Sequence, residues 1–203
     1  ICQVDDIKRM VDEFSSFARM PKAKPESDDL NACIRQVIFL MRVGNADIDI
    51  IETLPTTPSF AQFDRRLFSQ ALTNLIKNAI EGIAAREEGS NEEAGRVEVK
   101  VALHEDWAEV DIIDNGKGFP PMNRLRMLEP YMTTRSEGTG LGLPIVAKII
   151  EDHGGRLELL DAPSGKGACV RIILPLAPQE GKTDVSQEAA VIDNEKMIKR
   201  GEA

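Results

Sequence analysis

Apolar side chains recur at intervals of three and four residues in four segments of this chain, which is the spacing of amphipathic helices. These segments are residues 1–20, 28–42, 64–86 and 141–153. Asp28 or Asp29 can cap the second helix and Asp64 the third, because aspartate oxygens accept hydrogen bonds from the amides of a first helical turn. Gly154 and Gly155 follow the fourth segment, and glycine commonly ends a helix.

Between and after these helices, apolar and polar residues alternate with the period of two that is typical of strands. The strand segments are residues 47–54, 60–63, 97–101, 107–113, 156–161 and 168–174. The third and fourth of them are close enough in the chain to form a hairpin. The order of elements predicts an α/β two-layer sandwich, with a mixed sheet and helices on one face.

The same pattern divides the chain into four parts. Residues 27–176 are predicted to form one domain, the proline-flanked residues 21–26 a linker, and the polar residues 177–203 a tail. The apolar seam of residues 1–20 consists of Val4, Ile7, Val11, Phe14 and Ala18. Such a seam needs a partner helix, although this helix could instead fold back on its own domain. Because the chain begins inside this pattern, we expect a longer protein whose upstream part could be membrane-anchored.

Composition narrows the classes of function. The chain has 203 residues, 42% of them hydrophobic, and a net charge of −9. These values are typical of a globular protein and unfavourable for general binding to nucleic acid or to an anionic membrane. Cys2, Cys33 and Cys169 are isolated, so we expect reduced thiols rather than a disulfide framework or a zinc site. No apolar run approaches the ~18 residues of a membrane helix, and no signal peptide is recognisable.

Two asparagines interrupt the third helical segment, in NLIKNAIEG at residues 74–82. Asn74 and Asn78 are four residues apart and therefore lie on the same face of the helix. A buried amide is costly without hydrogen-bond partners, so each could simply bond to backbone or water. Alternatively, Asn78 offers its side-chain oxygen to a hard cation such as Mg²⁺, which prefers oxygen ligands.

The segment DNGKGF at residues 114–119 follows directly on an apolar strand. An ordinary turn would explain it. The alternative is that the Asp114 carboxylate accepts a hydrogen bond from an exocyclic amine. Gly116 and Gly118 would then let the backbone approach a flat ring without a side chain in the way.

Two further segments could contact phosphate. EGTGLGL at residues 137–143 leads into the last helix, and the free amides of a helix start favour an anion, although a flexible hinge is the simpler alternative. Its glycine spacing matches neither the Walker loop nor the dinucleotide-binding fingerprint. EPYMTTR at residues 129–135 supplies hydroxyls and a cation that suit a terminal phosphate, although a polar loop is the simpler explanation.

Together and in this order, the four segments resemble the ATP-binding domain of the GHKL superfamily, which includes gyrase, Hsp90, histidine kinases and MutL. NLIKNA matches its N box, DNGKG its G1 box, EPYMTTR its F box and GTGLGL its G2 box. HGG at 153–155 and SGKGA at 164–168 match its usual ending. Within this group the chain looks like a bacterial sensor histidine kinase, and the resemblance covers residues 27–176.

The opening helix extends the resemblance. VDEFSSFARMP at residues 11–21 is similar to the second dimerisation helix of nitrogen-regulation sensor kinases. Residues 1–20 would then be part of a dimerisation and histidine-phosphotransfer domain. The resemblance implies a homodimeric full-length protein, with this chain as a cytoplasmic domain of an inner-membrane-anchored parent.

The resemblance also implies a Bergerat-type ATP site, with roles for the residues singled out above. Asp114 would hold the adenine amino group, and Gly116 and Gly118 would border the base. Asn78 would bind Mg²⁺, and Asn74 would lie near the phosphates.

The remaining nucleotide contacts implied by the resemblance belong to a lid, residues 120–137, and to the segment after it. They are Thr133, Thr134, Gly138, Thr139, Gly140, Leu141 and Gly142. Thr134 and Arg135 would approach the terminal phosphate and, with Asn74, assist its transfer. Closure of the lid would exclude water.

The sequence departs from the family pattern at two points that bear on its expected kinase activity. The family phosphorylates a histidine in an HExxNP motif, but the two histidines here are His104, in LHEDW, and His153, at the end of the last helix. The chain should therefore bind ATP but not autophosphorylate on its own. The resemblance implies that it transfers the γ-phosphate to a histidine on an upstream helix absent from this chain, for relay to a response regulator. Ala168 stands where many relatives carry Thr or Ser, so one contact near the base would be missing.

Two other functions remain open on the sequence alone. A GHKL serine/threonine kinase of the anti-sigma-factor type would share the nucleotide site but leave the seam of residues 1–20 unexplained. A non-catalytic interaction module would use nucleotide as a structural ligand. Fold alone does not separate these functions.

Overall fold

The computed structural model describes residues 21–86, 93–120, 124–130, 132 and 140–176. The predicted helix of residues 1–20, the tail and half of the predicted lid lie outside these residues. In chain order, the elements are β1 Glu26–Asp29, α2 Leu30–Gly44, β2 Asp49–Thr53, β3 Phe60–Phe63, α3 Arg65–Ala84, β4 Arg96–Leu103, β5 Trp107–Asp114, η1 Arg124–Leu128, α4 Gly142–Asp152, β6 Arg156–Asp161 and β7 Ala168–Pro175.

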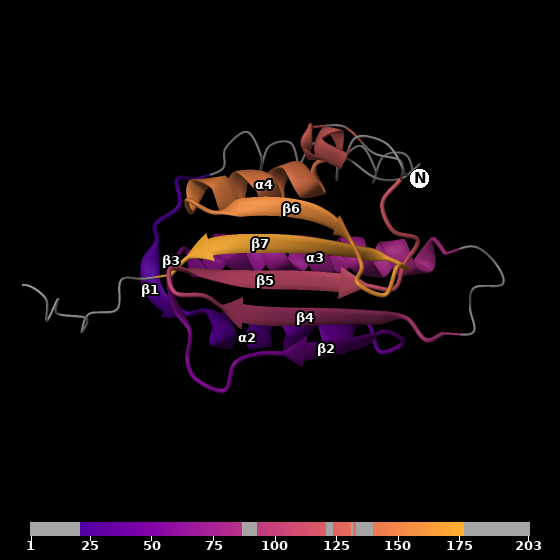
Figure 1. Ribbon diagram of the computed structural model, residues 1–203, viewed down its shortest axis with the longest axis horizontal. Helices are drawn as coiled ribbons and strands as arrows, with labels where there is room; N and C mark the ends of the chain where they lie inside the picture. Colours follow the sequence, from indigo (N-terminus) through magenta and orange to yellow (C-terminus); the bar gives the residue numbers. More distant parts are fainter. Residues whose placement is uncertain (1–20, 87–92, 121–123, 131, 133–139, 177–203) are drawn as a thin grey trace, which may run out of the picture.

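A five-stranded sheet in the order β2-β4-β5-β7-β6 forms one layer of the domain. β2 runs parallel to β4, whereas the β4–β5, β5–β7 and β7–β6 pairs are antiparallel, so the sheet is mixed as predicted. Helices α2, α3 and α4 cover one face of this sheet (Figure 1). The predicted two-layer α/β sandwich is confirmed.

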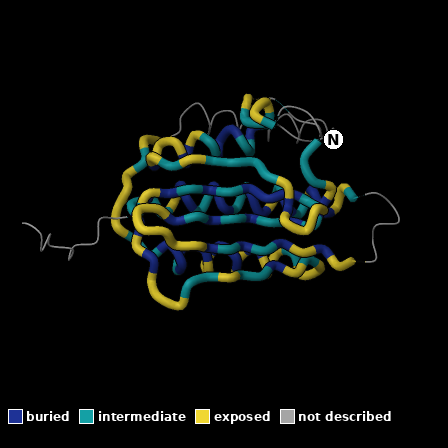
Figure 2. Tube along the Cα trace, viewed as in Figure 1, coloured by how far each residue is buried: buried dark blue, intermediate teal, exposed yellow. Residues whose placement is uncertain are grey.

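The strands are buried on alternate residues, as the sequence pattern requires. Val97, Val99 and Val101 of β4 and Ala108, Val110 and Ile112 of β5 pack against the helices. The opposite face of the same strands is more polar: Arg171 forms a bidentate ion pair with Asp111, with distances of 2.8 Å. Figure 2 shows the resulting separation of a buried interior from exposed edges and loops.

A two-stranded sheet of β1 and β3 was not predicted, because Glu26 lies in the segment that was predicted to be a linker. The strand ESDD is polar and shows no apolar alternation, and it forms through backbone pairing with Phe60–Phe63, more than 30 residues further along the chain. The short helix η1 lies inside the predicted lid, residues 120–137, for which no helix was predicted. Both elements depend on partners that a local pattern does not reveal.

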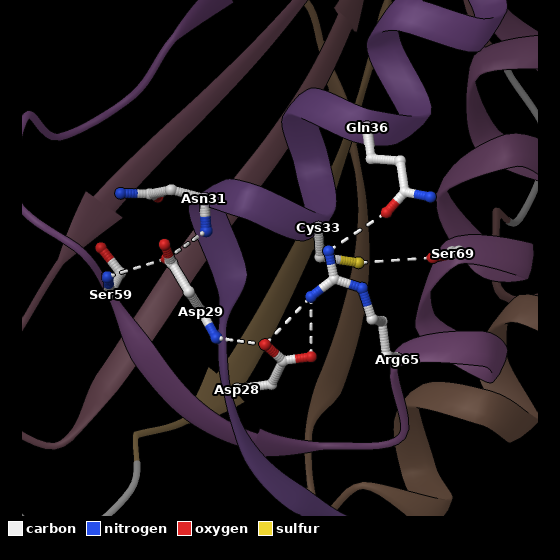
Figure 3. Close-up of polar contacts among 8 residues, drawn as sticks. All are labelled: Asp28, Asp29, Asn31, Cys33, Gln36, Ser59, Arg65 and Ser69. Atoms are coloured by element: carbon white, nitrogen blue, oxygen red, sulfur yellow. Dashed lines mark hydrogen bonds and ion pairs between the residues drawn. The ribbon is translucent and has the colours of Figure 1, made fainter.

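The two candidate caps of α2 have different tasks (Figure 3). Asp29 is the cap: its Oδ1 accepts hydrogen bonds from the backbone amides of Asn31 at 3.0 Å and Ser59 at 3.1 Å. Asp28 instead accepts two hydrogen bonds from Nη1 of Arg65, at 3.0 and 2.8 Å, and this contact lowers the pKa of Asp28. The network fixes α2, the strand β3 and the start of α3 relative to one another.

Among the described residues, we find no helix with the length and apolar character needed to cross a bilayer.

Candidate functional site

Asp114 lies at the end of β5 and is nearly buried, with 9% of its surface exposed. Its Oδ1 accepts hydrogen bonds from the backbone amide of Gly116 at 2.8 Å and from that of Ala168 at 3.2 Å. A carboxylate held by two amides is fixed in orientation and can accept further hydrogen bonds. Ala168 contributes through its backbone, so the departure noted in the sequence does not affect this contact.

The glycines of DNGKGF pack against protein backbone. A Cβ on Gly116 would lie 2.6 Å from the carbonyl carbon of Gly82 in α3, and the amide of Lys117 donates to the Gly82 carbonyl at 3.1 Å. Gly118 has a φ of 74°, and a Cβ there would lie 3.0 Å from the carbonyl oxygen of Gly167. The fold therefore requires glycine at both positions, whatever role these residues have toward a bound ring.

Two glycines that were not predicted as site residues, Gly82 and Gly167, shape the surroundings of Asp114. Gly167 has a φ of 98°, and a Cβ there would lie 1.9 Å from the carbonyl oxygen of Asp114. Gly82 forms the helix surface on which the DNGKGF loop rests. The motif SGKGA contained Gly167, but its contact with Asp114 joins residues more than 50 positions apart and has no local signal.

Asn115, the second residue of DNGKGF, was also not predicted as a site residue. Its Oδ1 accepts from the amide of Arg96 at 2.8 Å, and its Nδ2 donates to the carbonyl of Ala94 at 2.9 Å. These bonds join the DNGKGF loop to the beginning of β4. The loop is thus fixed by α3 on one side and β4 on the other, and this holds the carboxylate of Asp114 in place.

Asn74 and Asn78 are half-buried and lie one turn apart on α3, as predicted. The amide of Asn78 faces the first residue of α4, since a Cβ on Gly142 would lie 3.6 Å from its Nδ2 and 3.7 Å from its Oδ1. The structure therefore brings together two of the predicted segments, the asparagine helix and the end of EGTGLGL.

The start of α4 differs from the starts of the other helices. Asp29 and Asp64 cap α2 and α3 through their side chains, whereas Leu141 provides no side-chain cap for α4. Gly140 just before it has a φ of 68°. The amides of a helix start, with the helix dipole behind them, favour an anion.

The other predicted site residues lie outside the described part of the chain. They are Thr133, Thr134, Arg135, Gly138 and Thr139. Their predicted roles stay predictions.

His153 is buried and serves the fold. Its Nε2 accepts a hydrogen bond from the amide of Asp64 at 2.8 Å, so the ring proton is on Nδ1, which donates to the carbonyl of Ile149 at 2.6 Å. His104 lies at the turn of the β4–β5 hairpin, where its ring stacks on Trp107 with centroids 4.5 Å apart. Neither environment resembles a phosphoacceptor helix.

The described residues could supply only part of the coordination of a magnesium ion, with phosphate oxygens and water supplying the rest. Among them, no three His, Cys, Asp or Glu side chains are grouped closely enough to hold a metal ion. Mg²⁺ in phosphate sites usually keeps several waters and takes few protein ligands in addition to phosphate oxygens. The amide oxygen of Asn78, beside the start of α4, suits that arrangement.

Comparisons with known proteins place these features in a family. The family model described as histidine kinase-, DNA gyrase B-, and HSP90-like ATPase matches residues 63–178. The nitrogen regulation protein NtrY of Azorhizobium caulinodans is 52% identical over 190 residues, which are 93% of this chain and 24% of that protein. The signal transduction histidine-protein kinase AtoS of Escherichia coli is 29% identical, over 89% of this chain and 29% of that protein. This chain thus spans less than a third of either relative.

Solved structures agree with this assignment. The mycobacterial sensor histidine kinase MprB matches with a TM-score of 0.64 at 28% identity, over 77% of this chain and 100% of that chain. The catalytic domain of the histidine kinase ThkA matches with a TM-score of 0.65 at 28% identity, over 75% of this chain and 96% of that chain.

Proposed function

Because this chain belongs to the family of histidine kinase-, DNA gyrase B- and HSP90-like ATPases, we propose that it is the ATP-binding catalytic domain of a sensor histidine kinase. In this function it binds ATP and transfers the γ-phosphate to a histidine on an upstream helix of the full-length protein. The relatives NtrY and AtoS support this choice within the family, since both are named as signalling or regulatory proteins and AtoS as a histidine-protein kinase.

The observation that carries the proposal is the way Asp114 is held. Two backbone amides orient its carboxylate, and glycine backbone surrounds it on the sides of α3 and β7. An amine donor such as the exocyclic group of adenine suits an oriented and nearly buried carboxylate.

The phosphates would lie at the other end of the site, toward α4. The start of α4 presents the positive end of the helix dipole, and Asn78 of α3 faces its first residue, with Asn74 one turn earlier on the same helix. When bound, Mg²⁺ would neutralise charge on the phosphates. Thr134 and Arg135 retain their proposed role at the terminal phosphate, where a hydroxyl and a guanidinium stabilise developing charge. Catalysis would then consist mainly of positioning and charge stabilisation.

The phosphoacceptor belongs to another part of the full-length protein. Both ring nitrogens of His153 are engaged in the domain interior, and His104 lies on a hairpin. We therefore propose that the acceptor histidine is upstream, in a homodimeric helical domain to which residues 1–20 contribute. A response regulator would receive the phosphate, and the parent protein would place this domain on the cytoplasmic side of the inner membrane.

Calorimetric titration of the chain with ATP and ADP, with and without Mg²⁺, tests the nucleotide site. We expect a micromolar Kd, corresponding to about −8 kcal/mol. Asp114→Asn should weaken binding about 10- to 100-fold, because a charged acceptor is lost while the amide oxygen can still bond to Gly116 and Ala168. Asp111→Asn is the matched control: it removes a carboxylate from the same strand, but on the face paired with Arg171.

The magnesium contact and the transfer need their own measurements. Asn78→Ala should weaken binding of Mg²⁺-ATP more than binding of ATP with chelator present. Incubation with Mg²⁺-ATP and a separately produced helical domain carrying HExxNP should label its histidine, recognised by acid-labile phosphate. Absence of nucleotide binding in the folded chain would overturn the proposal. Acid-stable phosphate on serine of a partner protein would favour the anti-sigma-factor type of kinase.

A further inference from the structure

Arg124, the first residue of η1, joins two segments that border the Asp114 site. Its Nη2 donates to Oδ1 of Asp161 at 2.5 Å, and its Nη1 to the carbonyl of Leu159 at 3.4 Å. The same guanidinium lies over the ring of Phe119, with 5.5 Å from Cζ to the ring centroid. Phe119 is the last residue of DNGKGF and packs against the core. One side chain thus connects the end of this loop to the end of β6.

Both ends of this connection lead to the carboxylate of Asp114 within a few residues. Asp161 pairs with Ala168 across β6 and β7, and the amide of Ala168 donates to Asp114. On the other side, Phe119 directly follows Gly118, which packs against the carbonyl of Gly167, the residue before Ala168. Arg124 therefore bridges the two chain segments that determine where the carboxylate lies.

The ion pair between Arg124 and Asp161 is exposed to solvent, so it can orient the loop without contributing much to stability. The side chain of Arg124 is 31% exposed and that of Asp161 is 68% exposed. An ion pair this exposed contributes little to the free energy of folding, because water screens it. It can nevertheless restrict the orientation of a loop, since the guanidinium has three directional contacts.

We propose that Arg124 is a positioning residue for the nucleotide site, which braces the DNGKGF loop against β6 and so aligns Asp114 with the purine amine. This inference rests on the proposed function. It assigns to Arg124 no contact with nucleotide; the residue acts through Phe119 and β6.

The test uses the full chain, with ADP affinity measured by calorimetry and thermal unfolding measured in parallel. We expect Arg124→Ala to weaken ADP binding roughly 5- to 20-fold, from the loss of the ion pair and the cation–π contact. The melting temperature should change by less than about 3 °C. Arg124→Lys should recover part of the affinity, because a cation remains but the fork is lost. Arg156→Ala is the matched control, since it removes another exposed arginine ion pair of β6, with Glu158 at 2.8 Å.

A double-mutant cycle with Asp114→Asn distinguishes positioning from a general effect. If Arg124 acts through Asp114, Arg124→Ala should weaken binding less than about two-fold further once the carboxylate is gone. An equal loss in both backgrounds would overturn the inference, as would wild-type affinity in Arg124→Ala, or the same affinity loss in Arg156→Ala. Failure of the wild-type chain to bind ADP would overturn the proposed function, and this inference with it.

Discussion

Replacement of His153 by alanine tests whether the HGG histidine serves the fold rather than the chemistry. The substitution leaves the amide of Asp64 without its 2.8 Å partner and removes the 2.6 Å bond to the carbonyl of Ile149. A buried donor left unpaired costs about 1–3 kcal/mol, and a lost hydrogen bond about 1 kcal/mol. Removal of the ring from a position that is 5% exposed adds a cavity. We therefore expect a loss of about 3 kcal/mol in the free energy of unfolding.

Urea unfolding followed by far-ultraviolet circular dichroism measures this loss. With a slope of about 2 kcal/mol per molar urea, the midpoint should fall by roughly 1.5 M. His104→Ala is the matched control, since it removes the other histidine of the chain from an exposed hairpin, and it should change stability by about 0.5 kcal/mol or less. The ADP affinity of folded His153→Ala should stay within about two-fold of wild type, below 0.5 kcal/mol. Unchanged stability with lost nucleotide affinity or lost phosphotransfer would refute the structural role.

Three further predictions concern other parts of the domain. Because the Arg65 contact lowers the pKa of Asp28, the pair stabilises the native state above the ordinary pKa of aspartate, and the contribution is lost as the pH falls through the lowered value. Arg65→Met should thus cost about 0.5–1 kcal/mol at neutral pH and progressively less below about pH 4, in urea unfolding at each pH. Burial raises the pKa of the Cys33 thiol and, with Asp111 nearby, that of Cys169 to about 12. In a Cys2→Ser chain, a thiol reagent should therefore label neither residue before unfolding, and fast native labelling would contradict the burial. Gly167→Ala should reduce both stability and ADP affinity strongly, because its Cβ would meet the Asp114 carbonyl at 1.9 Å. Gly165→Ala, with a φ of 75° and nothing within 4 Å, should cost about 1–2 kcal/mol in stability alone.

The parts of the fold that follow from local rules were predicted from the sequence. The Asp64 cap, the 3.6-residue period of α3 and the alternation in β4 and β5 are visible within a few consecutive residues, and the structure confirms each. The strand β1 was missed because it is polar and forms through its pairing with β3. The helix η1 was missed because glycine, proline and polar residues surround it.

In the candidate site, too, residues in local motifs were predicted and residues that act through distant contacts were missed. Asp114, Asn78 and Gly142 were indicated by the order of the motifs. The structure places Asn78 beside Gly142, and it fixes the carboxylate of Asp114 at the end of β5. Gly82, Asn115 and Arg124 were missed, because each acts through a contact with a residue distant in the chain. Arg124 reaches β6, more than 30 positions away, and no spacing rule links the two.

The segment DNGKGF illustrates why a motif can be recognised correctly and still be explained incompletely. Its glycines were interpreted as space for a ligand ring, but Gly116 already lies against the backbone of α3 and Gly118 against that of Gly167. These contacts are with the protein's own backbone, so the requirement for glycine is a property of the fold. The close packing at these glycines shapes the loop so that the Gly116 amide donates to Asp114 at 2.8 Å. This hydrogen bond helps to hold the Asp114 carboxylate in place. The glycines therefore contribute to recognition by fixing the acceptor, whether or not they also border the base.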